Sequence, residues 1–247
     1  MGGTTIATAT TPRGTLLLRR RDDGALELRV NGVFVMDSVE TSTESALAEH
    51  ALAALEQPRD ATARAADEPN RILVGGLGLG YTLRRLVESR QVQEIVVVEI
   101  EGALIDWHRR GDIISTADII DDPRVCLVEA DVRDAVEGLA ASSLDALILD
   151  VDNGPGFLVY AGNAALYRKG FLESCRRALR GGGALVVWSA DEAPTLEGEL
   201  ASVFGVVEHH PIDVVLGTRN ETYHVYRAAG DRCGEGPAVD VEPPIGA

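Results

Sequence analysis

The sequence predicts a doubly wound α/β fold, with a mostly parallel seven-stranded sheet and a small β-hairpin appendage at the N-terminus. From Arg71 onward, short apolar segments alternate with helical ones in a regular order. Several apolar segments, such as IVVV and ALILD, are continuous, which is typical of parallel strands that helical crossovers cover on both faces. Before Arg71, two alternating runs flank the pair Asn31-Gly32, a strong short-range signal of a hairpin.

Each element follows from a local pattern. The appendage contains two strands, at 26–30 and 33–36, and a helix over 44–55 with three leucines on one side. The main sheet is expected to contain strands at 71–74, 94–99, 125–129, 145–150, 183–188 and 222–227, and a weaker one at 206–211. The helices of the main domain are expected to begin near Tyr81, Gly102, Val132, Asn163 and Pro194.

The chain is expected to divide into three parts. Residues 1–67 comprise a tail, the hairpin and its helix, residues 68–228 form the α/β domain, and residues 229–247 form a disordered tail. The first dozen residues and the last twenty or so are rich in Gly, Pro, Ala and Thr without apolar periodicity, which predicts tails. Because an isolated hairpin is marginal in water, it is expected to pack on the main domain or to pair with a hairpin of another subunit.

Composition excludes several classes of function. The 247 residues include 23 Lys and Arg against 39 Asp and Glu, a formal net charge of −16, so no nucleic-acid partner is expected. No apolar stretch approaches the roughly 18 residues of a membrane span, and no leader pattern is visible, so we expect a soluble, cytoplasmic protein without a membrane partner. The three cysteines lack C-x-x-C spacing and the histidines lack the spacing of a metal site, so no metal is expected.

A glycine-rich segment, Val74-Gly75-Gly76-Leu77-Gly78-Leu79-Gly80, joins the first strand of the main sheet to a helix. Glycines there let the backbone turn sharply and approach a ligand, and the helix N-terminus adds free N–H groups, although the pattern also suits a merely tight turn. Glu99 ends the next strand, 21 residues after Gly78, where an acidic side chain accepts ribose hydroxyls. Glu101 is the alternative residue for this role.

Polar side chains follow the third and fourth strands. Asp131 is placed to accept a hydrogen bond from an adenine amino group, although an Asp at this position is, taken alone, more typical of the N-cap of the helix that starts at Val132. Asp150, Asp152 and Asn153 form a turn-rich cluster, which is either a catalytic cluster or an Asx-turn loop. Ligands of open α/β sheets bind outside the carboxyl ends of the strands, which favours the catalytic interpretation. Three aromatic side chains suit either pocket lining or ordinary packing: Tyr160, Tyr167 and Trp188.

Five segments occur in a particular order and spacing: GGLGLG, VVVEIEG, DDPRVCLVEAD, LDALILDVDNGPG and LYRKGFLESCRRALRGGGALVV. They resemble the spermidine synthase family of aminopropyltransferases, which has the Rossmann-like fold of class I S-adenosylmethionine-dependent enzymes. The resemblance covers about residues 26–227. It implies that the loop from Gly75 to Gly80 wraps the sulfonium end of the nucleoside, and that Glu99 holds the ribose and Asp131 the adenine.

The resemblance also implies a catalytic loop that starts at Asp150. Carboxylates of that loop receive the substrate amine and help to remove its proton. Three positions depart from the family pattern. Gly78 stands where the family has an Asp that binds the terminal ammonium of the donor, and Ser45-Ala46 stands where it has a His-Glu pair. Asn153 stands where it has a second catalytic Asp, for which the neighbouring Asp152 is a possible substitute.

The sequence therefore predicts a transferase of polyamine biosynthesis. It would take an aminopropyl or related alkyl group from S-adenosylmethionine or decarboxylated S-adenosylmethionine to a small amine. Two alternatives stay open, a methyltransferase acting on a small molecule and a catalytically silent protein that binds the nucleoside. Gly78 favours the methyltransferase, whereas the loop at Asp150 and the hairpin favour aminopropyl transfer. The resemblance implies a homodimer or homotetramer.

Overall fold

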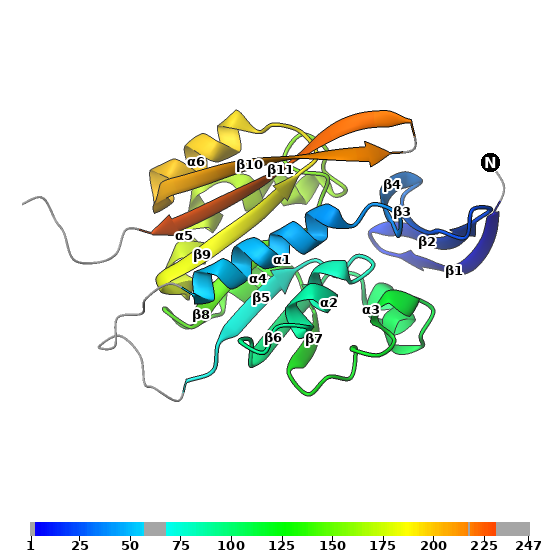
Figure 1. The fold of residues 1–247 in the computed structure, drawn as a ribbon, viewed down its shortest axis with the longest axis horizontal. Coiled ribbons are helices and arrows are strands. Elements are labelled where there is room, and N and C mark those ends of the chain that lie inside the picture. The colour runs from blue at the N-terminus through cyan, green and yellow to red at the C-terminus, as the bar shows by residue number, and fades with distance from the viewer. Residues whose placement is uncertain (1–2, 57–67, 217, 231–247) are drawn as a thin grey trace, which may run out of the picture.

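The computed structural model describes residues 3–56, 68–216 and 218–230. It contains a seven-stranded sheet with helices on both faces and a separate four-stranded sheet near the N-terminus (Figure 1). The predicted α/β fold class is therefore confirmed. Of the tail expected at 229–247, residues 231–247 lie outside the described residues. Ala229 and Gly230 belong to the last strand of the main sheet instead. Within the described ranges, no helix is long and apolar enough to cross a membrane.

The main sheet is parallel over five strands and antiparallel at one edge. Its strands are β5 (Arg71–Gly75), β6 (Glu94–Glu99), β7 (Val125–Glu129), β8 (Leu144–Leu149), β9 (Leu179–Ser189), β10 (Gly205–Leu216) and β11 (Arg219–Gly230). Their order is β10-β11-β9-β8-β5-β6-β7, and β11 runs antiparallel to both β9 and β10. The winding reverses at β5, since β6 lies on one side of it and β8 on the other. Such a reversal point is where ligands bind in open α/β sheets.

The last two strands are longer than the sequence predicts. They pair continuously from Gly205 opposite Gly230 to Leu216 opposite Arg219. The apolar pattern in the sequence of β10 is weak because this strand lies at the edge of the sheet and most of its residues are exposed or half-buried. Hydrogen bonding to β11 therefore extends this strand beyond the residues that apolar periodicity predicts.

Helices cover both faces of the main sheet, as a doubly wound fold requires. One face packs against α4 (Val132–Glu137), α5 (Lys169–Ala178) and α6 (Pro194–Phe204). The other face packs against α1 (Ser42–Leu55), α2 (Tyr81–Val87) and α3 (Gly102–Arg109). Two short 3₁₀ helices are present, η1 (Ile114–Thr116) and η2 (Ala161–Tyr167). The helix expected near Asn163 is thus split into η2 and α5, because Arg168 between them is extended.

The N-terminal sheet is larger than the predicted hairpin. It contains β1 (Gly3–Thr11), β2 (Gly14–Arg21), β3 (Leu26–Val30) and β4 (Val33–Asp37), all antiparallel and in that order. The predicted turn is confirmed, with Asn31 and Gly32 both at positive φ. The expectation of a tail over the first dozen residues is wrong, because Gly3–Thr11 pairs along β2. Its threonines suit a strand, and only Ile6, Ala7 and Ala9 pack against the core, too few for a clear apolar pattern.

The N-terminal sheet packs on the main domain, one of the two alternatives for the hairpin. Leu16, Leu18 and Leu28 lie in one buried cluster with Leu104 and Trp107 of α3. The cluster also contains Leu79 of the glycine-rich segment. The two sheets therefore share an apolar interface next to that segment.

Leu18→Ala is expected to lower the free energy of unfolding by about 2 to 5 kcal/mol, because Leu18 is 0% exposed in this interface. Val33→Ala, in the same sheet but 52% exposed, is the control, with an expected effect of about 0.5 kcal/mol or less. Urea unfolding of the two variants measures both values. Equal effects would show that the sheet does not dock through this cluster.

Candidate active site

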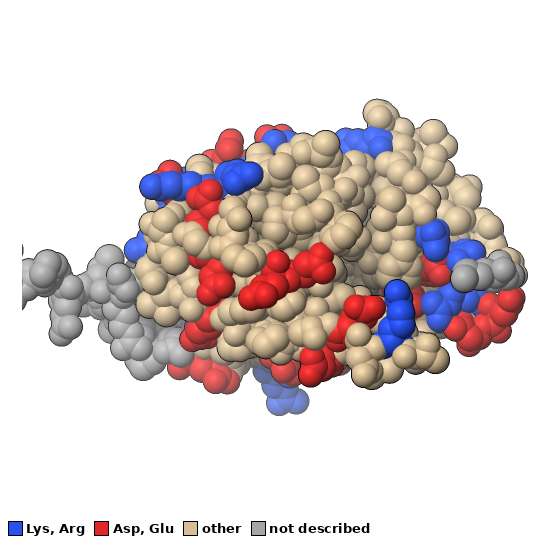
Figure 2. Space-filling view, turned by 90° about the horizontal axis from the view of Figure 1, so that it is seen from above, with Lys and Arg blue, Asp and Glu red and all other residues tan. Residues whose placement is uncertain are grey.

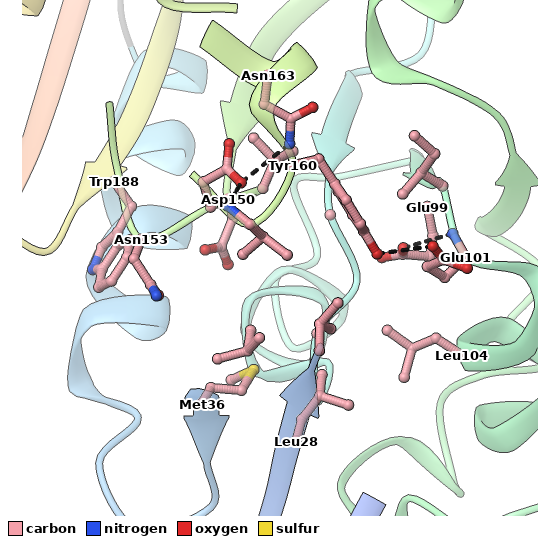
Figure 3. A pocket seen from close by; sticks show the side chains of 18 of the residues that line it. Leu28, Met36, Glu99, Glu101, Leu104, Asp150, Asn153, Tyr160, Asn163 and Trp188 are labelled. Carbon is pink, nitrogen blue, oxygen red and sulfur yellow. Dashed lines mark hydrogen bonds between the residues drawn. The ribbon is translucent and has the colours of Figure 1, made fainter. Parts of the chain in front are cut away.

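A cavity of about 300 Å³ lies between the N-terminal sheet and the carboxyl ends of the central strands. Figure 3 shows Glu99, Glu101 and Tyr160 at one end and Asp150, Asn153 and Trp188 at the other. Met36 and Leu28 of the N-terminal sheet line one side (Figure 3). The cavity thus brings most of the predicted site residues together, and it adds side chains from β3 and β4.

The glycine segment turns sharply beneath the cavity. Gly76 and Gly78 line it, whereas Gly75 and Gly80 pack behind it. A Cβ on Gly76 would lie 2.0 Å from the carbonyl oxygen of Asp150, and one on Gly80 would lie 2.2 Å from Thr116 Cγ2. Both glycines also have positive φ, 95° and 82°. Glycine is therefore required here for close packing as well as for turning.

His108 holds this turn from behind. Its Nε2 lies 2.9 Å from the carbonyl oxygen of Gly78, and its Nδ1 lies 2.5 Å from Thr116 Oγ1. A carbonyl oxygen only accepts, so Nε2 donates to it and Nδ1 accepts from the hydroxyl. No sequence pattern pointed to this role, because the histidine lies 30 residues from its partner.

Glu99 and Glu101 lie at one end of the cavity and have different partners. The carboxylate of Glu99 accepts the backbone N–H groups of Leu77 and Glu101, each at 2.9 Å. Burial raises the pKa of Glu99 above its usual value. Glu101 Oε1 accepts from Tyr160 Oη at 2.8 Å and from Arg13 Nε at 2.9 Å, and Glu101 Oε2 is buried without a partner among the described residues.

Asp131 is the N-cap of α4, as its alternative interpretation predicted. Its carboxylate accepts a hydrogen bond from the backbone N–H of Arg133 at 2.9 Å. It also forms an ion pair with the guanidinium of the same arginine at 2.7 Å. The hydrogen bond from the Arg133 guanidinium holds the pKa of Asp131 below its usual value. Asp131 also lines the cavity, so its cap role does not remove it from reach of a ligand.

The three polar residues after β8 have unequal roles. Asp150 forms part of the cavity wall, and its Oδ2 accepts from Thr82 Oγ1 at 3.2 Å. Burial raises the pKa of Asp150 to about 6. Asp152 stabilises the loop, because its carboxylate accepts hydrogen bonds from the Val159 amide at 2.7 Å and from Asn163 Nδ2 at 3.1 Å. Asn153 Nδ2 lies 3.4 Å from the carbonyl oxygen of Phe34, which connects the loop to β4.

Two of the three predicted aromatic side chains line the cavity. Trp188 contacts Tyr223 edge to face with ring centroids 5.2 Å apart, and both rings belong to the wall. Tyr160 also lines it, whereas Tyr167 lies behind it, with its Oη 3.4 Å from Asp152.

The wall of the cavity is strongly acidic. Its lining includes eight carboxyl side chains: Asp37, Glu40, Glu44, Glu99, Glu101, Asp131, Asp150 and Asp152. Among residues 3–56, 68–216 and 218–230, no Lys, Arg or His lines it. The same part of the chain contains no cluster of three His, Cys, Asp or Glu side chains suited to a metal ion. Acidic side chains also run through the middle of one outer face, with basic ones mainly toward its ends (Figure 2).

Sequence reasoning missed three residues at this site. Met36 and Glu44 line the cavity, and Arg13 pairs with Glu101 behind it. All three belong to the N-terminal region, whose docking onto the main domain the sequence left open. The acidic residue at the start of α1 was a detectable signal, whereas Arg13 lay in the segment expected to be close to a tail.

The sequence matches the family model of the spermine/spermidine synthase domain over residues 28–205. It is 32% identical over 155 residues to polyamine aminopropyltransferase 2 of Pseudomonas aeruginosa, covering 58% of this chain and 42% of that protein. It is also 32% identical over 117 residues to putrescine N-methyltransferase 4 of Nicotiana tabacum, covering 47% of this chain and 28% of that protein. The chain thus spans less than half the length of both curated relatives.

One solved structure shares the whole architecture. The spermidine synthase of Thermotoga maritima superposes with a TM-score of 0.75 at 17% sequence identity, covering 93% of this chain and 74% of that one. This likeness shows that the two chains have the same fold.

His108 is expected to make the protein sensitive to acid. Burial lowers its pKa to about 4, against about 6.5 in an unfolded chain, so the unfolded state binds more protons between these values. Stability is therefore lost as the pH falls, and His108 alone accounts for about 2 kcal/mol between pH 7.5 and pH 5. Urea unfolding of the wild type and His108→Gln at both pH values measures this difference. Parallel pH profiles of the two proteins would contradict it.

Proposed function

Because the chain belongs to the spermine/spermidine synthase family, we propose that it transfers an aminopropyl group from decarboxylated S-adenosylmethionine to a small amine. The nucleoside lies at the end of the cavity with Glu99, Glu101 and Asp131. Glu99 accepts the ribose hydroxyls, and Asp131 accepts the adenine amino group. Gly76 and Gly78 let the backbone approach the sulfonium. These roles are supported by the position of all five residues in the cavity wall.

The charge of the cavity is the observation that carries the proposal. Its eight carboxyl side chains and the absence of a cationic side chain among its described lining residues suit a ligand that is wholly cationic. Decarboxylated S-adenosylmethionine has a sulfonium and an ammonium and no carboxylate. The carboxylate of ordinary S-adenosylmethionine would enter this acidic wall without a cationic partner, which is costly in a desolvated site.

Asp150 is the residue that receives the acceptor. The neutral amine attacks the propyl carbon beside the sulfonium, so a C–N bond forms while the C–S bond breaks. The electron pair of the C–S bond stays on sulfur, which leaves methylthioadenosine. The excess proton on the new ammonium passes to the Asp150 carboxylate. A pKa of about 6 keeps this carboxylate largely ionised at neutral pH and yet a stronger base than an ordinary one.

Methyl transfer from ordinary S-adenosylmethionine is the second candidate. It is supported by the 32% identity to a putrescine N-methyltransferase over 47% of this chain. Here the acceptor amine would attack the methyl carbon at the same sulfonium, and S-adenosylhomocysteine would remain. The two candidates therefore differ in the donor and in the thioether that is released.

The setting of the enzyme is proposed from the same family resemblance. We propose a cytoplasmic enzyme that acts on a small amine, without nucleic acid or a membrane, as a homodimer or homotetramer. The division between residues 1–67 and an α/β domain from residue 68 is likewise kept as a proposal, whereas the expected boundary at 229 is moved, because Ala229 and Gly230 belong to β11. The docking of the N-terminal sheet on its own main domain removes the need for a partner subunit to stabilise the hairpin.

Each donor is expected to give a different result with 1,4-diaminobutane as acceptor. Decarboxylated S-adenosylmethionine should be consumed with release of methylthioadenosine, whereas ordinary S-adenosylmethionine should react at least about tenfold more slowly, since its carboxylate is unpaired. Mass spectrometry of the released thioether distinguishes the two reactions. Release of S-adenosylhomocysteine as the main product would establish the second candidate in place of the first.

Asp150→Asn is expected to lower kcat by a factor of about 10² to 10⁴, because the substitution keeps the shape and removes the proton acceptor. Binding of methylthioadenosine should stay within about twofold of the wild type, since the nucleoside end of the cavity is untouched. Steady-state kinetics and calorimetric titration measure the two quantities. Unchanged kcat would refute the role of Asp150, and a loss of nucleoside binding would indicate that the variant has lost its local structure.

A further inference from the structure

Most carboxyl groups in the cavity wall already have partners. Six of the eight accept hydrogen bonds from backbone amides or arginine side chains: Asp37, Glu40, Glu99, Glu101, Asp131 and Asp152. The other two have hydroxyl partners, Thr82 Oγ1 at 3.2 Å from Asp150 and Thr43 Oγ1 at 3.0 Å from Glu44. Within the described ranges, neither forms an ion pair. Asp150 and Glu44 are therefore the carboxyl groups that a bound cation would neutralise.

Glu44 lies in the first turn of α1. This helix packs along α2, β8, β9 and β11, and Glu44 lines the same cavity as Gly76 and Asp150. Burial, with a contribution from the negative charge of Asp150, raises the pKa of Glu44 to about 8. Burial raises the pKa of the phenol of Tyr81, the first residue of α2, and the charge of Glu44 adds a smaller contribution. Glu44 thus faces both Asp150 and the start of α2.

In this structure Met36 occupies the space that a side chain at Gly78 would need. A Cβ there would lie 2.6 Å from Met36 Sδ, and Gly78 has a φ of 50°. Met36 Sδ also accepts the backbone N–H of Leu79 at 3.1 Å. The thioether of Met36 therefore fills the space above the turn, and this side of the cavity offers a ligand no negative charge.

We propose that Glu44 binds the terminal ammonium of the donor's aminopropyl chain, while Asp150 receives the acceptor amine. This inference rests on the proposed function. The sulfonium is placed over Gly76, and the propyl chain then extends toward α1, where Glu44 is the carboxyl group without an ionic partner. A cation between Glu44 and Asp150 offsets their mutual repulsion and allows both to ionise. Glu44 is accordingly the residue that distinguishes the aminopropyl donor from a nucleoside without an ammonium.

Two thioethers of adenosine isolate this contact. Methylthioadenosine has no ammonium, whereas 5′-deoxy-5′-(3-aminopropylthio)adenosine carries the propylammonium chain of the donor on a neutral sulfur. Glu44→Gln is expected to weaken binding of the aminopropyl thioether by about 10- to 100-fold and to leave methylthioadenosine within about twofold. Calorimetric titration at pH 8.5, where the Glu44 carboxyl is ionised, measures both affinities.

Glu49→Gln is the matched control, because it makes the same change of charge on the same helix at an exposed side chain paired with Arg85. It should leave both affinities within about twofold. Equal loss of both ligands in Glu44→Gln, or no loss of either, would overturn the inference. So would a variant that binds both thioethers normally but shows a raised KM for the diamine acceptor alone. If the wild type does not bind methylthioadenosine, the nucleoside site fails, and the proposed function fails with it.

Discussion

The turn from β5 into α2 is the constraint on which the rest of the site depends. Gly76 passes so close to the carbonyl oxygen of Asp150 that a single methyl group would collide with it. The amide of Asp150 in turn donates to the carbonyl oxygen of Gly75 at 2.9 Å, so the glycine segment and the start of the loop after β8 are one backbone unit. His108 fixes the other end of the turn through the carbonyl of Gly78. Any shift of this turn would therefore move both the glycine backbone that lines the cavity and the Asp150 carboxylate that we propose receives the amine.

The pKa values of the carboxyl groups in the cavity wall depend on burial as much as on the number of charges around them. Asp131 is half-exposed and paired with Arg133, and its pKa is lowered, whereas Asp150 and Glu44 have no such partner and their pKa values are raised. A carboxyl group with a raised pKa gains more from a ligand cation than a paired one, because its own desolvation is otherwise uncompensated. The acidic wall thus contains two kinds of carboxyl group. Some are already paired with protein donors, and others, such as Asp150 and Glu44, would gain their ionic partner from a bound cation.

Much of the fold was predictable from local patterns, because buried parallel strands such as those containing Val97 and Ile148 are continuous apolar runs. The position of three cavity-lining residues was predictable for the same reason, because the ends of parallel strands meet at one edge of the sheet: Glu99 ends β6, and Asp131 and Asp150 follow β7 and β8. Asp152 illustrates the limit. Its residue type suited catalysis, yet its bonds to the amide of Val159 and to Asn163 form only when the loop folds back on itself. Long-range contacts of that kind leave no periodic signal.

The N-terminal sheet is the part of the site that the sequence describes least. Its first strand is rich in threonine and its second ends in three arginines, so these strands are ordered by pairing with each other and by docking on Leu104 and Trp107. That docking also brings Arg13 to Glu101, and Met36 to Gly78. The sheet therefore contacts the cavity both behind the end that contains Glu101 and along the side that Met36 lines. The turn from β5 into α2 is therefore completed by side chains of a neighbouring sheet, so a substitution in that sheet would alter the wall of the cavity without changing the α/β fold beneath it.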